Sequence, residues 1–214
     1  TAEWPQYRWR PLIGPVPGLV DDEGFFHHRP EAVAARADPA AVHDEICAQI
    51  ERALADGIRP THLDAHMGTA FLPAFAETFF DIGHRYGIGI PLIRDMSGLF
   101  DIVRLGAPDT GYLCELIAEA ERRSLPVFDR FRIGFTPEGA NAGAFFRDLL
   151  SDSGSGLTWF AIHANAPGDF ATIAPHMAYP RESEYVLFRE TESARVFPTG
   201  QAQGLTWREA VGGG

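Results

Sequence analysis

The order of its predicted strands and helices limits the folds open to this chain more than any other feature. Short apolar segments of strand character alternate with longer amphipathic segments, and Gly or Pro stands at most boundaries. This alternation predicts an α/β fold with a mostly parallel sheet, either open or closed as a barrel, because the helices are long enough to connect parallel strands. We expect a single domain over residues 1–214, since no fixed-period repeat or clear linker divides the chain.

Capping residues define the clearest helix, which is predicted over residues 39–56. Asp38 suits the N-cap, Pro39 suits the first turn, and Gly57 suits the position after the last turn. The N-terminal segment 1–29 is rich in Pro, Gly and aromatic residues, which predicts a structured loop. Further helices are predicted over 71–86, 111–123, 138–150, 180–190 and 207–211, and strands over 60–65, 89–94, 127–135 and 157–163.

Composition argues against several classes of function. The formal net charge is −11, and such a surface repels phosphate backbones and anionic lipid. We therefore expect no nucleic-acid or membrane partner, whereas a neutral small molecule is unaffected. No run of about 18 apolar residues predicts a membrane span. Cys47 and Cys114 are too few for a disulfide framework and are predicted to be buried thiols of a cytoplasmic protein.

Three polar residues alternate along the predicted strand that begins at residue 60: His62, Asp64 and His66. Alternate residues of a strand share one face, so all three are predicted to point the same way. They lie at the carboxyl end of the strand, where sites gather in parallel α/β folds. A single histidine there is more often structural, but burying three such groups without partners is costly. The pattern favours a metal site, for which two His and one Asp suit Zn, Fe or Mn, or a catalytic network.

Two other strand ends carry candidate residues. His163 ends the apolar strand over 157–163, and it is either a general acid or base near a common pocket or a capping histidine in a loop. Arg94 ends the strand over 89–94, where it either contacts substrate or pairs with Asp64, and a structural ion pair is the favoured interpretation. The acidic segment 21–24 lacks the twelve-residue pattern of a calcium loop.

The segment Thr61-His62-Leu63-Asp64-Ala65-His66 resembles the Thr-His-x-Asp-x-His signature of the YdjC/ChbG (ChbG/HpnK) family of carbohydrate deacetylases. The resemblance implies a distorted (β/α) barrel of mostly parallel strands. It also implies a hydrolase that removes acetyl groups from N-acetylated sugars with a divalent metal ion, Mg²⁺ or Zn²⁺. Weaker similarities to the family, at residues 7–12, 17–24, 93–94, 162–163, 181–184 and 205–209, extend it over most of the chain.

The same resemblance implies roles for individual residues. His66 matches the last metal-binding histidine of the family, and Asp64 is expected to orient it as part of the catalytic apparatus. His163 matches a late histidine and is expected to give a proton to the leaving amine, while Arg94 is expected to bind substrate. The family's metal-binding aspartate and its other histidine belong to stretches that would precede Thr1, together with the first strands. The chain is therefore expected to be N-terminally incomplete.

Three interpretations stay open at this point. The protein is a metal-dependent carbohydrate deacetylase, which acts on C–N bonds other than peptide bonds, or a metal-dependent hydrolase of the same fold with another substrate. Alternatively it is a non-catalytic sugar-binding homologue without metal, since one histidine rarely holds a divalent ion. The aromatic residues Trp4, Tyr7 and Trp9 either stack on sugar rings or belong to the core. A homodimer is one way to cover the apolar edge of a sheet that lacks its first strands.

Overall fold

The computed structural model describes residues 1–96, 99, 111–123, 125–151, 155–190 and 207–210. The chain divides into two compact units, Thr1–Val127 and Phe128–Gly214. The fold is α/β, as the alternation predicts: helices separate the strands along the chain, and β2 (Val127–Ile133) pairs in parallel with β3 (Thr158–Ala161).

The described strands do not form a closed barrel. In the part of the chain that the structure describes, there are three strands: β1 (Leu92–Asp95), β2 and β3. A small closed barrel needs about eight strands, so the expected distorted barrel is not completed by these residues.

In the first unit, the helix predicted from its capping residues forms as α2 (Pro39–Ala55). The Asp38 carboxylate accepts a hydrogen bond from the Ala40 N–H at 2.9 Å, and Gly57 follows the helix with a φ of 81°. A shorter helix, α1 (Pro30–Arg36), precedes it in a segment for which no helix is predicted. These local contacts fix the boundaries of α2.

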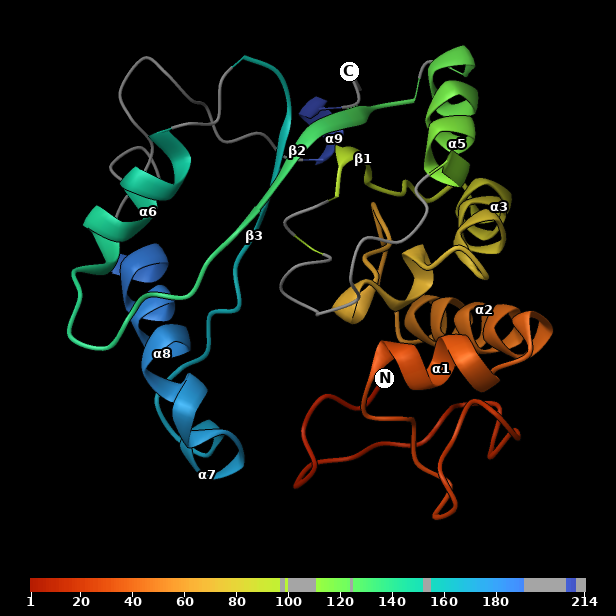
Figure 1. Cartoon of the computed structure of the whole chain (residues 1–214), viewed down its shortest axis with the longest axis horizontal. Coiled ribbons are helices and arrows are strands. Elements are labelled where there is room, and N and C mark those ends of the chain that lie inside the picture. Colours follow the sequence, from red (N-terminus) through yellow and green to blue (C-terminus); the bar gives the residue numbers. More distant parts are fainter. Residues whose placement is uncertain (97–98, 100–110, 124, 152–154, 191–206, 211–214) are drawn as a thin grey trace. The chain divides into compact units, whose positions relative to one another are not determined.

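Helix α3 (Ala76–Tyr86) packs against α2, and the two lie side by side in Figure 1. Buried Ile50 from α2 meets buried Ile82 from α3 in one core cluster. A second cluster of the same unit joins residues of the N-terminal loop to the helices and contains Ala2, Leu19, Phe26, Val33, Val42, Leu72 and Phe75. The N-terminal loop is therefore packed on the core.

Asp21 stabilises a turn in this loop. Its carboxylate accepts hydrogen bonds from the N–H groups of Phe25 and Glu23, each at 3.0 Å, and it pairs with Arg8 at 3.0 Å. These hydrogen bonds, that of the Phe25 N–H first, hold the pKa of Asp21 below its ordinary value despite some desolvation.

The predicted strand over residues 60–65 is wrong in extent. An isolated parallel bridge joins His62 to Gly89, and the Leu63 N–H donates to the Gly89 carbonyl at 2.8 Å. The 3₁₀ helix η1 (His66–Phe71) follows directly. β1 is also shifted, because it spans Leu92–Asp95 in place of residues 89–94.

The helix predicted over residues 71–86 begins late, at Ala76. Pro73 supplies the reason, because proline disfavours the helical conformation in the residue before it. Leu72 is accordingly extended, with φ of −66° and ψ of 148°, which ends η1 and delays α3.

Helix α5 (Gly111–Arg122) agrees with its prediction over residues 111–123. It carries Cys114, which is exposed, whereas Cys47 on α2 is half-buried; both thiols are free. The prediction of a buried thiol is therefore wrong for Cys114. No helix in the described residues has both the length and the apolar character that crossing a membrane requires.

In the second unit, β2 and β3 run side by side in Figure 1, and Arg130 stands opposite Thr158 in the register. Helices α6 (Ala142–Ser151) and α8 (Pro175–Glu190) pack against each other. Phe146 of α6 is fully buried and contacts Phe160 and Phe188, with ring centroids 5.6 and 5.5 Å away. This aromatic core fixes α8 beside the end of β3.

Helix α8 begins five residues before its predicted start at residue 180. Pro175 is suited to the first turn, while Pro180 lies inside the helix and cannot donate an intrahelical hydrogen bond. The short helices α7 (Phe170–Ile173) and α9 (Trp207–Ala210) complete the unit. Residues 205, 206 and 211, which the sequence also assigned to the tail, lie outside the described residues.

Candidate active site

His66 is placed by a sharp backbone turn. Met67 has a φ of 54° and Gly68 a φ of 68°, and Met67 alone among the described non-glycine residues has a positive φ. A left-handed backbone costs about 1–2 kcal/mol for a residue with a Cβ atom. The Gly68 N–H bonds the Ala65 carbonyl at 2.7 Å, and the Thr69 hydroxyl donates to the His66 carbonyl at 3.1 Å. These contacts fix the backbone around His66 and thereby the direction of its side chain.

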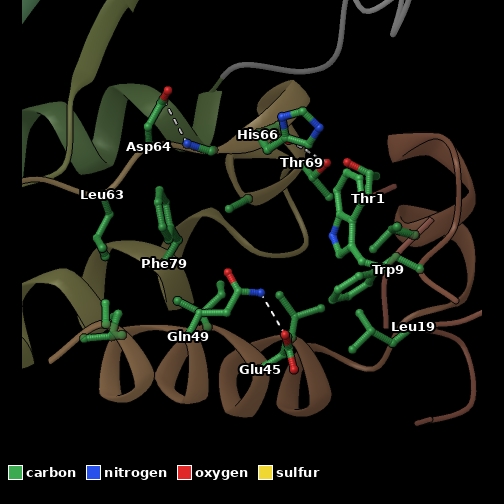
Figure 2. Close-up of a pocket in the computed structure, with 18 of the residues that line it drawn as sticks. Thr1, Trp9, Leu19, Glu45, Gln49, Leu63, Asp64, His66, Thr69 and Phe79 are labelled. Carbon is green, nitrogen blue, oxygen red and sulfur yellow. Dashed lines mark hydrogen bonds between the residues drawn. The ribbon is translucent and has the colours of Figure 1, made fainter. Parts of the chain in front are cut away.

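Asp64 and His66 line a pocket of about 320 Å³ in the first unit (Figure 2). Glu45 and Gln49 of α2 lie on the opposite side of this pocket from His66. Apolar side chains, among them Leu19, Phe26, Val42, Ile46, Ile50 and Phe79, supply much of its lining. A largely apolar pocket of this size, with a few converging polar groups, is typical of a small-molecule site.

Two aromatic rings, those of Trp9 and Tyr7, lie in a row beside His66. The ring centroid of Trp9 lies 6.2 Å from that of His66, and the ring centroid of Tyr7 lies 6.4 Å from that of Trp9. Tyr7 is 61 % exposed, whereas Trp9 is half-buried and lines the pocket. The His66 side chain is itself 51 % exposed, and its Nε2 lies 3.8 Å from the Glu3 carboxylate. A ligand can therefore reach the exposed imidazole, beside which Trp9 lines the pocket.

Glu45 connects the N-terminal loop to α2. It is only 3 % exposed, and its carboxylate accepts hydrogen bonds from the Ile13 N–H at 3.1 Å and from the Gln49 amide at 2.8 Å. Both bonds satisfy a charge that would otherwise be costly to bury. They also hold the loop that carries Trp9 against the pocket.

The alternation predicted for His62, Asp64 and His66 is not kept. Leu63 and Ala65 line the pocket beside Asp64 and His66, whereas His62 is not among the lining residues. The bridge at His62 ends after one pair of residues, so the backbone beyond it no longer alternates as a strand does. Asp64 is exposed, and its carboxylate accepts a hydrogen bond from the Ala65 N–H at 2.9 Å.

Arg94 lies on β1 and forms an ion pair with Glu121 of α5. An ion pair is the interpretation that the sequence favoured, but the carboxylate in this contact belongs to Glu121, whereas Asp64 is the partner expected from the sequence. Arg94 is not among the residues that line the pocket, so its role in substrate binding stays a prediction.

His163 belongs to the second unit, in the loop after β3. Its N–H donates to the Glu184 carboxylate at 2.5 Å, and its ring centroid lies 5.5 Å from that of Phe135. Burial raises the pKa of Glu184 from 4.5 to about 7, against the lowering effects of the His163 N–H and of Arg181.

Sequence analysis missed Glu184. One signal was available: Glu184 stands three and four residues before Leu187 and Phe188, which pack on the aromatic core, so helical spacing places this acid on an apolar face.

The described residues do not by themselves fit a divalent-metal site. In that part of the chain, no three His, Cys, Asp or Glu side chains are grouped so that they could hold an ion. His66 has the Glu3 carboxylate nearby, but tight protein sites for Zn²⁺ use three or four protein ligands.

Residues 3–197 match a family described as YdjC-like protein. The chain belongs to the YdjC-like protein family. A carbohydrate deacetylase of Thermus thermophilus is 31 % identical to this YdjC-like chain over 209 residues, which are 97 % of the chain and 74 % of that relative. A carbohydrate deacetylase of Geobacillus stearothermophilus is 37 % identical over 87 residues, which are 40 % of the chain and 34 % of that relative.

A solved structure shares the fold. It belongs to a protein of Enterococcus faecalis V583 that is named for cellobiose-phosphate cleavage, and it superposes with a TM-score of 0.60 at 19 % identity. The match covers 88 % of the YdjC-like chain and 69 % of the other. At this level of identity the likeness concerns the fold alone.

Proposed function

We propose that this YdjC-like protein is a carbohydrate deacetylase that hydrolyses the acetamido group of an N-acetylated sugar. One observation carries the proposal: similarity to the Thermus thermophilus carbohydrate deacetylase runs through 97 % of the chain. Asp64 and His66 of the central motif line a pocket, which supports it. The pocket is exposed to solvent at His66, so a polar substrate can enter it.

The walls of the pocket suit a sugar ring. One face of a pyranose presents C–H groups, which pack on aromatic rings such as Trp9, while its hydroxyl groups need polar partners. Thr69, Gln49 and Asp64 supply such partners around the pocket. A net charge of −11 does not hinder the approach of a neutral sugar.

Amide hydrolysis needs a base for water and an acid for the leaving amine. In this proposal His163 is the acid, since an imidazole titrates near neutral pH. Asp64 orients His66, and Arg94 contacts substrate. Because Arg94 is paired with Glu121, substrate contact would require this ion pair to loosen.

The proposed cofactor is a divalent metal ion, Mg²⁺ or Zn²⁺, with His66 as one of its ligands. Calorimetric titration of Zn²⁺ and Mg²⁺ into the wild type and into His66→Ala tests this assignment without reference to catalysis. We expect weaker binding by the variant; equal binding would remove His66 from the ligand set.

The experiment that tests the site is acetate release from N-acetylated sugars by the wild type, His66→Ala and His84→Ala. His84 is the matched control, because it is an exposed histidine of α3 outside the pocket. We expect His66→Ala to lose about 100-fold or more of the rate and His84→Ala to keep it. An active His66→Ala variant would contradict the proposed site.

A further inference from the structure

Helix α8 holds the loop after β3 at two points. The carboxylate of Glu184 accepts the N–H of His163 at 2.5 Å, and the carbonyl of Arg181 accepts the N–H of Asn165 at 3.0 Å. Both acceptors lie one turn apart on the same helix, so they fix two alternate residues of the loop. The backbone on either side of Ala164 is thereby tied to a rigid element.

The burial of Glu184 lowers the stability of the fold. Glu184 is fully buried, and within the described residues its Oε1 has no hydrogen-bond partner. A buried carboxyl that is only partly satisfied costs stability. Its helix neighbours Leu187 and Phe188 pack on the aromatic core, where an apolar residue would fit without this cost.

The contact that Glu184 makes points to a reason for its presence. A carboxyl oxygen accepts the backbone N–H here, as a side-chain amide oxygen could, whereas an apolar side chain offers no acceptor. The N–H concerned is that of His163, whose ring also packs beside Phe135. Backbone and ring of the same histidine are therefore both held.

We propose that Glu184 is a positioning residue for His163: it fixes the backbone at His163 and so sets the orientation of the imidazole. The inference rests on the proposed deacetylase function for its catalytic consequence. Its structural part, the dependence of the His163 conformation on Glu184, does not require that function.

The test compares Glu184→Gln, Glu184→Leu and the control Glu182→Gln in the full chain. Glutamine keeps an oxygen that can accept the His163 N–H, whereas leucine removes it at similar volume and suits the apolar neighbours. Glu182 is a half-buried acid on the same helix. We expect Glu184→Leu to lose about 10- to 100-fold in kcat with little change in KM, while Glu184→Gln and Glu182→Gln stay within about threefold of the wild type.

A second readout separates this inference from the proposed function. The NMR resonances of the His163 amide and imidazole should move in Glu184→Leu and change little in Glu182→Gln. If the wild type releases no acetate, the proposed function fails, and the NMR comparison still decides the role of Glu184. A folded Glu184→Leu variant with wild-type His163 resonances would overturn the inference.

If Glu184→Leu does not fold, Glu184→Gln tests the positioning role of Glu184. It must then retain a downfield His163 amide proton, which marks the hydrogen bond, and at least about a third of the wild-type kcat where the wild type is active. Loss of that hydrogen bond with His163 otherwise unmoved would show that the histidine is positioned without Glu184 and would overturn the inference.

Discussion

At the scale of single residues, the surroundings of His66 depend on a strained neighbour. Met67 adopts a φ of 54°, which β-branched residues tolerate poorly. We expect Met67→Ile to lower the free energy of unfolding by about 1–2 kcal/mol, and Met67→Asn to cost less because asparagine visits this conformation readily. Urea denaturation measures both. Equal stability of the two variants would show that the turn relaxes when Met67 is replaced.

Trp9 is the residue that we expect to determine the affinity for sugar. Its ring centroid lies 6.2 Å from that of His66, in a position to stack on a sugar bound beside the imidazole. Trp9→Ala should raise KM about tenfold with a smaller effect on kcat, because an aromatic contact contributes about 1–1.5 kcal/mol. Trp9→Phe is the matched control and should retain most of the affinity. An unchanged KM in Trp9→Ala would assign Trp9 to the core alone.

Glu184 makes a specific contribution to the pH dependence of stability. Its pKa rises from 4.5 to about 7 on folding, so between these values the folded state binds more protons than the unfolded state. The contribution is therefore most favourable at low pH and is lost as the pH rises through about 7. Denaturation at pH 5 and pH 8 measures this contribution. Between these pH values the free energy of unfolding should fall more for the wild type than for Glu184→Gln. Parallel pH profiles would contradict the raised pKa.

The sequence motif singled out Asp64 and His66 because its pattern is local, and both residues line the pocket; their roles stay predictions. The sequence left Trp9 undecided between stacking and core. In the structure Trp9 packs against the buried cluster of the N-terminal loop, and it also lies beside His66 in the lining of the pocket. Glu184 could not be linked to His163 from sequence, because the hydrogen bond joins residues 21 positions apart.

At the scale of elements, local capping was predictable and pairing was not. The boundaries of α2 follow from Asp38 and Gly57, which act on adjacent residues. The strand over residues 60–65 reduced to one bridge at His62, since strand length depends on a distant partner, here Gly89. Pro73 and Pro175 shifted the starts of α3 and α8 through their effects on neighbouring backbone.

The N-cap of α2 gives a prediction at this scale. Asp38→Ala should lower the free energy of unfolding by about 1 kcal/mol, because the Ala40 N–H loses its side-chain acceptor. Asp38→Asn is the control and should stay close to the wild type, since asparagine caps equally well. Thermal unfolding of the three proteins measures the difference. An equal loss in both variants would indicate that the charge of Asp38, and not its capping bond, stabilises the helix.

At the scale of the whole chain, family membership reaches over residues 3–197 and so includes parts of both compact units. The acidic surface, with a net charge of −11, disfavours anionic polymers and leaves neutral sugars unaffected. This expectation about partners stays a prediction; it rests on composition because long-range charge effects depend little on the exact fold. Composition could not decide whether the expected distorted barrel is closed, since closure depends on how many strands pair.

The most direct test of the central claim is acetate release by the unmodified protein from N-acetylated mono- and disaccharides, with Zn²⁺ or Mg²⁺ added. The same sugars carrying O-acetyl groups alone serve as controls. The account predicts acetate and free amine in equal amounts from at least one N-acetylated sugar and none from its O-acetylated control. Folded protein that releases no acetate from any N-acetylated sugar, with either metal, would contradict it.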